Sequence, residues 1–228
     1  MPMASDAIPV RLQDEVPFTC QRCGNCCRNV EKQIMLEPLD AYQLGRFLHQ
    51  HGGEIQSIED VYSQYAEPML LAQGFPVFTL KTTGAERTCV FLQGGQCRVY
   101  EGRPRACRLY PFSAMGGQRG RRFAFYQCLD GHQGHFTGSK VSIKDWMYQN
   151  FTKDAREFVE ADAAAMTELG RLLRELGPNG QQNCLFQLLY YRYYNFDLDC
   201  PFMEQYQSNH RALLAELQHR LDRNEKES

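Results

Sequence analysis

Four cysteines stand within eight consecutive positions near the start of the chain, from Cys20 to Cys27 in the stretch FTCQRCGNCC. Thiolates in a Cys-x-x-Cys loop can converge on one metal ion, because the turn brings both sulfurs to the same side and lets backbone N–H groups donate to them. Two cysteines that are adjacent in sequence seldom bind the same metal ion. We therefore expect the side chains of Cys26 and Cys27 to point apart and to serve two different sites, or two metals of one cluster.

The cysteines are distributed unevenly along the chain. Eight of the ten fall in the first 128 residues, and they are Cys20, Cys23, Cys26, Cys27, Cys89, Cys97, Cys107 and Cys128. Eight thiols divide into two sites of four, so we predict all eight as metal ligands, with the first four shared between the sites. The other two, Cys184 and Cys200, are predicted to be small buried hydrophobic residues.

Spacing alone does not decide between Zn²⁺ and an iron–sulfur cluster, because both accept four thiolates. The later cysteines are separated by seven, nine and twenty residues, which is longer than the paired Cys-x-x-Cys of zinc ribbons. We therefore expect an iron–sulfur cluster of the 4Fe-4S kind, with Zn²⁺ as the alternative. His132 and His135 follow Cys128 closely enough to replace a cysteine ligand, although a Gly-rich surface turn is the favoured interpretation there.

Seven arginines and a single acidic residue lie between Arg98 and Arg122. Guanidinium groups would offset the negative charge of four thiolates around Zn²⁺ or around an oxidised four-iron cluster, and would donate hydrogen bonds to sulfur. On this basis Arg103, Arg108 and Tyr100 are predicted to bind the cofactor. An anion-binding patch for a carboxylate or phosphate substrate and a solvated basic loop are the alternatives.

The elements that position these residues are short in the first part of the chain. Apolar periodicity predicts a helix over 38–52, and Ser57 with Asp60 predicts a capping box for a second helix that ends near 67–68. A helical turn is expected at 103–107. Runs of β-branched and aromatic residues predict short strands at 76–83, 89–92, 96–100 and 122–127.

From Ser142 onward the pattern is helical. It predicts helices over 142–176, with a break, and over 181–195 and 202–221, with a frayed end at 224–228. The aromatic residues at 190–196 are interpreted as core packing. The predicted fold class is α+β, with a cysteine-rich metal-binding domain over 18–138 and a helical extension over 139–224 packed on it.

Composition excludes several classes of function. The net charge is -2, and no apolar run approaches the roughly 20 residues that a membrane helix needs, so we expect neither nucleic acid nor a membrane as partner. A cytoplasmic protein that acts on an unknown protein or small-molecule substrate is expected. No Ser-His-Asp order, phosphate loop or GxGxxG is present.

An ordered pattern extends from Phe18 to Asp130. It consists of Cys20-x-x-Cys23-Gly24-x-Cys26-Cys27, Cys89-x-Phe91-Leu92, Cys97-x-x-Tyr100, Arg103-Pro104-x-x-Cys107-Arg108-x-x-Pro111-Phe112 and Cys128. This pattern resembles the CxxCxxCC, or YkgJ-like, cysteine-cluster family. The resemblance implies a zinc- or iron-chelating domain, in a family whose members are labelled iron–sulfur oxidoreductases or, through a relation to flagellin lysine N-methylase, methylases.

Three functions are compatible with these residues. The first is an iron–sulfur protein with a redox or cofactor-dependent enzymatic role. The second, implied by the resemblance, is an enzyme similar to a protein-lysine N-methylase. The third is a structural zinc-binding interaction module, in which all metal positions are closed and the helical part presents a surface to a partner.

The division into a metal-binding and a helical part generates a prediction. Replacing Cys184 or Cys200 by serine should leave the metal content unchanged, whereas Cys23→Ser and Cys107→Ser should lose metal, because only the latter pair belongs to the predicted ligand set. Metal per chain, measured on the four purified variants, checks this. A Cys200→Ser variant that loses as much metal as Cys107→Ser would contradict the division.

Overall fold

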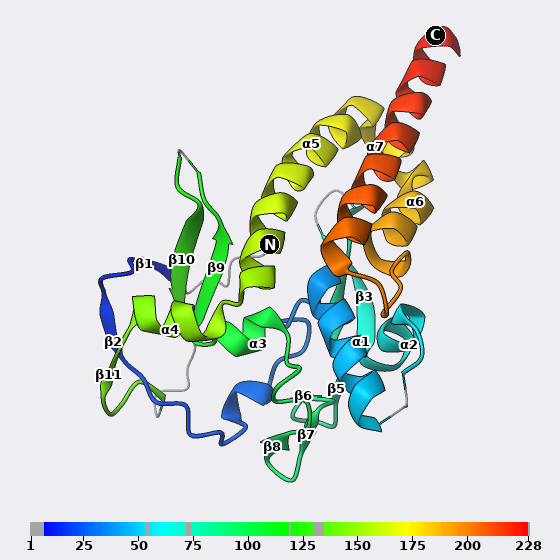
Figure 1. The fold of residues 1–228 in the computed structure, drawn as a ribbon. Coiled ribbons are helices and arrows are strands. Elements are labelled where there is room, and N and C mark those ends of the chain that lie inside the picture. The colour runs from blue at the N-terminus through cyan, green and yellow to red at the C-terminus, as the bar shows by residue number, and fades with distance from the viewer. Residues whose placement is uncertain (1–6, 53–54, 72–73, 119, 130–134, 228) are drawn as a thin grey trace. The chain divides into compact units, whose positions relative to one another are not determined.

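The structure is a computed structural model that describes the chain outside residues 1–6, 53–54, 72–73, 119, 130–134 and 228 (Figure 1). Helices and small antiparallel sheets make up the fold, which confirms the predicted α+β class. The chain forms two compact units, one from residues 1–34 and 82–163 and the other from residues 35–81 and 164–228. Residues of the predicted extension 139–224 thus belong to both units, and the domain boundaries stay a prediction.

The first unit contains the predicted ligands and most of the short strands. Its three-stranded antiparallel sheet has the order β1 (Ala7–Val10), β10 (Phe123–Cys128), β9 (Phe112–Gly116). Its other strands pair as β2 (Glu15–Pro17) with β11 (Lys140–Ser142), β5 (Thr82–Thr83) with β6 (Thr88–Cys89), and β7 (Leu92–Gln93) with β8 (Gln96–Cys97). Its helices are η1 (Asn25–Cys27), α3 (Arg105–Leu109), α4 (Ile143–Asn150) and the start of α5 (Lys153–Asn183).

An aromatic core supports the first unit. Phe18 packs edge-on against Trp146 of α4, with the ring centroids 5.1 Å apart. The indole Nε1 of Trp146 donates to the carbonyl oxygen of Leu109 at the end of α3, over 2.9 Å. These contacts tie the residues just before Cys20 to the helix that carries Cys107.

The second unit is mainly helical. Its elements are α1 (Pro38–Gly52), α2 (Ile58–Tyr65), the hairpin of β3 (Ala66–Leu70) and β4 (Pro76–Leu80), the remainder of α5, α6 (Leu185–Leu189), the π-helix η4 (Tyr190–Tyr194) and α7 (Phe202–Glu227). Leu169 and Leu172 of α5, Leu188 of α6, and Leu213 and Leu217 of α7 are buried in one hydrophobic cluster. The apolar stripe predicted for the last helix is therefore its core-facing side.

Local sequence signals predicted several of these elements correctly. The helix at 38–52 is present, and the capping box is confirmed: the Ser57 hydroxyl accepts from the Asp60 N–H over 3.3 Å, and the Asp60 carboxylate accepts from the Ser57 N–H over 3.0 Å. Backbone donation from Gln56 and Ser57 lowers the pKa of Asp60. The helix ends at Tyr65 rather than near 67–68, because Ala66 begins a strand that pairs with β4.

The helical region differs in detail from its prediction. The expected break separates α4 from α5, but α5 continues past Leu176 through a kink at Gly177, where φ is 68°. The predicted helix 181–195 is divided between the end of α5, α6 and η4. The helix α7 extends to Glu227, beyond the predicted onset of fraying. Two strands that the sequence did not predict, β1 and β9, form ladders with β10.

The two late cysteines have different environments. Cys184 is fully buried, as predicted. Cys200 is exposed and its thiol donates to Asp197, so the prediction of a buried residue is wrong there. In the aromatic run, Tyr193 is buried and its hydroxyl donates to the Pro76 carbonyl over 3.0 Å, whereas Tyr190 is 41% exposed. Core packing therefore describes only part of that run.

Across the residues that the structure describes, no helix combines the length and the apolar character needed to cross a bilayer.

Two helical glycines of the second unit provide a matched test of packing. A Cβ at Gly45 would lie 2.9 Å from Val61 Cγ2 and 3.1 Å from Leu198 Cδ2, whereas a Cβ at Gly170 would meet only the Arg174 guanidinium at 3.4 Å. We expect Gly45→Ala to destabilise the protein by about 1 kcal/mol, because overpacking outweighs the gain in helix propensity. Gly170→Ala should stabilise it by roughly 0.5–1 kcal/mol. Urea unfolding checks both variants, and shifts of the same sign would contradict the packing argument.

Candidate metal centre

The cysteine-rich loop packs closely against the β7–β8 hairpin. Gly24, which precedes η1, has a φ of 73°, and a Cβ there would lie 2.8 Å from both the Gly95 carbonyl oxygen and Leu92 Cδ1. Only glycine combines this backbone conformation with such a close approach. The Gly24 position within the Cys-x-x-Cys-Gly-x-Cys-Cys motif therefore allows the loop to reach the hairpin on which Cys97 lies.

Cys26 and Cys27 form a hydrogen-bonded pair of thiols in η1. The expectation that their side chains point apart is wrong, because a 3-10 helix turns successive side chains by about a third of a turn, whereas a strand places them on opposite faces. The hydrogen bond from Cys27 lowers the pKa of Cys26 to about 7, although burial opposes this effect. Near neutral pH the pair can therefore lose one proton, which leaves a Cys26 thiolate that accepts a hydrogen bond from the Cys27 thiol.

Cys89 and Cys97 occupy corresponding positions in two hairpins. Burial raises the pKa of both thiols, and each sulfur also accepts a hydrogen bond from the backbone N–H two residues later, from Phe91 and Val99 respectively. Backbone N–H donation to sulfur stabilises the thiolate form that a metal requires. Phe91 and Val99 are buried, which holds these donors in place.

Five thiols interact electrostatically in this region. Besides the hydrogen bond with Cys26 and burial, repulsion from the Cys26, Cys107 and Cys89 sulfurs raises the pKa of Cys27. The Cys26 sulfur likewise raises the pKa of both Cys89 and Cys97, after the larger effect of burial. We call this set the thiol cluster, and its members are Cys26, Cys27, Cys89, Cys97 and Cys107.

Arg103 lies beside the thiol cluster. Its guanidinium stacks on the Tyr100 ring, 3.7 Å from the centroid. Its positive charge adds to the hydrogen bond from Cys27 in lowering the pKa of Cys26, and it partly opposes the rise that burial causes in the pKa of Cys97. The Nε and Nη1 atoms of Arg103 are buried and have no hydrogen-bond partner among the described residues. Buried guanidinium donors without an acceptor fit a site that holds a negatively charged group.

The other predicted cofactor-binding arginine has a different setting. Arg108 donates from Nη2 to the backbone carbonyl of Arg103, over 3.2 Å, and so supports the loop that carries Arg103. Arg22, which the sequence did not single out, lies with its guanidinium carbon 4.3 Å from the Tyr100 ring centroid. Its position between Cys20 and Cys23 is the signal that could have identified it, because a cation there adjoins two thiols.

Cys23 contacts a histidine. Its sulfur is 3.1 Å from Nε2 of His135, and Nδ1 of the same ring is 3.3 Å from the Tyr110 hydroxyl. His135 is buried, so the interpretation of this position as a surface turn is wrong, while His132 lies outside the described residues. Cys20 is exposed, and Cys128 ends β10. The Tyr110 hydroxyl can orient the His135 ring, as a hydrogen-bond partner of the second ring nitrogen does for a metal-ligating imidazole.

The side chains as placed do not form a complete coordination site. Within the described ranges, no group of three or more His, Cys, Asp and Glu side chains could hold a metal ion. The assignment of all eight cysteines as ligands therefore stays a prediction. The chemistry of the donor set does fit a thiolate-bound metal, because the thiol cluster combines sulfur donors with N–H groups and the buried cation of Arg103.

Comparison with known proteins agrees with this donor chemistry. Residues 19–128 match the model of the CxxCxxCC family, described as a "Putative zinc- or iron-chelating domain". The match supports metal binding, with zinc or iron as the metal, and the predicted relation to flagellin lysine N-methylase is not shown. Neither a curated protein nor a solved structure matches the chain.

The hydrogen-bonded thiol pair generates a prediction for the metal-free protein. Cys26 should be alkylated at a rate that rises with pH through a midpoint of about 7, because only the thiolate reacts and the Cys27 thiol stabilises it. Cys27→Ala should move the midpoint upward toward that of an ordinary thiol, whereas Cys27→Ser, which keeps a hydroxyl donor, should stay near the wild type.

Peptide mapping by mass spectrometry after timed iodoacetamide treatment measures the rate at Cys26 alone. Preparations are compared only where circular dichroism shows the same helical content. Equal midpoints in the alanine and serine variants would show that the hydrogen bond has no influence.

Proposed function

We propose that the CxxCxxCC domain of this protein holds an iron–sulfur centre of the 4Fe-4S kind and that the protein has a redox or cofactor-dependent enzymatic role. The observation that supports this most directly is the Arg103 guanidinium beside the thiol cluster, whose buried Nε and Nη1 atoms have no acceptor among the described residues. A four-thiolate site with its metal carries net negative charge, and Arg103 would offset that charge and donate to sulfur.

The residues of the proposed centre fall into metal ligands, hydrogen-bond donors to sulfur and groups that hold the Arg103 loop. The eight cysteines of residues 20–128 supply thiolates, and the N–H groups of Phe91 and Val99 stabilise two of them. Tyr100 holds the Arg103 guanidinium by stacking, and the Arg108 side chain fixes the backbone of that loop. His135 is an additional donor candidate beside Cys23. A cluster bound here would supply one-electron transfer or an open iron for a small-molecule or protein substrate.

A structural zinc module is the second candidate. The family description includes zinc, and a closed tetrahedral site uses the same thiolates and N–H donors as a cluster. It differs in carrying no redox activity. The methylase-like function stays a prediction from the sequence resemblance.

Anaerobic purification followed by metal and sulfide analysis separates the two candidates. We expect iron, acid-labile sulfide and a visible absorption band, all of which disappear in Cys107→Ser. Colourless protein that contains stoichiometric zinc and no iron would reject the iron–sulfur proposal in favour of the zinc module.

Arg103 provides a second readout on the same preparation. Arg103→Gln should lower the reduction potential by an amount on the order of tens of millivolts, because a nearby positive charge favours the reduced, more negative cluster. Arg121→Gln is the matched control, since Arg121 belongs to the same basic stretch but is exposed. An equal shift in both variants would mean that Arg103 acts only through net charge.

A further inference from the structure

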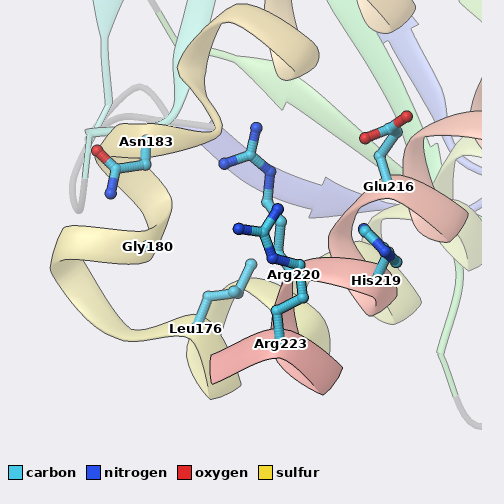
Figure 2. Close-up of a pocket in the computed structure, with 7 residues that line it drawn as sticks. All are labelled: Leu176, Gly180, Asn183, Glu216, His219, Arg220 and Arg223. Carbon is cyan, nitrogen blue, oxygen red and sulfur yellow. The ribbon is translucent and has the colours of Figure 1, made fainter. Parts of the chain in front are cut away.

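A pocket of about 420 Å³ lies in the second unit, and none of its lining residues is a predicted metal ligand (Figure 2). Residues of α5 and α7 line it, and they are Leu176, Gly180, Asn183, Glu216, His219, Arg220 and Arg223. The kink at Gly177 falls between Leu176 and Gly180. A pocket of this volume can contain a small organic molecule.

The pocket is basic on its α7 side. Figure 2 shows the side chains of Arg220 and Arg223 extending from α7 into the pocket, with Asn183 and Leu176 on the α5 side. Within the described part of the chain, neither guanidinium has an ion pair or hydrogen-bond partner, and Glu216 is paired with neither of them. Because Glu216 is the one carboxylate among the lining residues, two guanidinium groups leave the lining with a net positive charge, and a bound anion would offset their mutual repulsion.

The helix dipole explains only part of this arrangement. Positive side chains near a helix C-terminus are favourable, and Arg220 and Arg223 lie in the last turns of α7. That effect does not require both guanidiniums to line the same pocket. The convergence of two guanidinium groups on one pocket is what an oxyanion site needs, because each guanidinium can bind an oxyanion through two parallel N–H donors.

We propose that this pocket binds a phosphomonoester. The charge of a phosphomonoester is close to -2 at neutral pH, which matches two guanidinium groups, and its oxygens can accept from both forks. The Asn183 amide and the His219 ring supply further polar contacts, and Leu176, which is buried, supplies an apolar surface for the organic part. This inference is independent of the metal proposed for the other unit.

Calorimetric titration of the full chain tests the proposal. The probes are inorganic phosphate, phenyl phosphate and benzoate, each at constant ionic strength set with chloride. We expect saturable binding of both phosphates, with phenyl phosphate the tighter. Arg220→Gln and Arg223→Gln should each weaken phenyl phosphate binding about tenfold or more, the usual loss when a charge-assisted hydrogen bond is removed. Arg211→Gln, an exposed arginine of α7 outside the pocket, should bind as the wild type does.

Three results would overturn the proposal. One is the absence of saturable phosphate binding to the wild type. Another is an equal loss in Arg211→Gln, which would indicate a general charge effect. The third is benzoate binding as tightly as phenyl phosphate, which would indicate a carboxylate site. Asn183→Ala is a further variant that leaves the charge unchanged, and it should weaken binding without altering the unfolding midpoint of the unliganded protein.

Discussion

The interaction among closely spaced, partly buried thiols is the constraint on which the first unit depends. Each thiolate makes the next deprotonation harder: the hydrogen bond with Cys26, burial, and repulsion from the Cys26, Cys107 and Cys89 sulfurs together raise the pKa of Cys27. A cluster of sulfur donors is useful for metal binding only if that repulsion is offset. The surrounding structure offers three kinds of compensation: hydrogen bonding between thiols, backbone N–H donors, and a partly buried guanidinium.

These compensations come from separate short elements. The loop around Gly24 approaches the β7–β8 hairpin closely, and the hairpins present N–H groups to the sulfurs of Cys89 and Cys97. Aromatic packing of Phe18 against Trp146, with the hydrogen bond from Trp146 to Leu109, holds the residues before Cys20 to α4 and α3. A metal that bridged the thiols would add a further cross-link, because the binding free energy of a structural metal is also folding free energy.

The two units pose opposite electrostatic problems. In the first, sulfur donors lie near one another and Arg103 is their nearby cation, with donors that lack acceptors among the described residues. In the second, the guanidinium groups of Arg220 and Arg223 outnumber the single carboxylate of the pocket, that of Glu216. Closely spaced thiolates and an excess of positive charge in a pocket each carry a free-energy cost in the protein alone, so each arrangement indicates a ligand of the opposite sign, a metal cation in one case and an oxyanion in the other.

The sequence by itself determined the α+β class, the resemblance that the family-model match over residues 19–128 bears out, the capping box at Ser57 and the burial of Cys184. These features depend on local spacing, on apolar periodicity or on an ordered motif, all of which are readable along the chain. The ligand assignment itself stays a prediction.

Tertiary structure decided the rest. The unpredicted strands β1 and β9 exist because they pair with β10, and their own sequences carry little strand signal. His135 is buried against Cys23, and Arg103 lies near Cys26, through interactions between segments distant in sequence. The pairing of Cys26 with Cys27 depends on a helical turn after a glycine that must pack against Gly95. Spacing can count donors, but only the folded backbone decides which of them face one another.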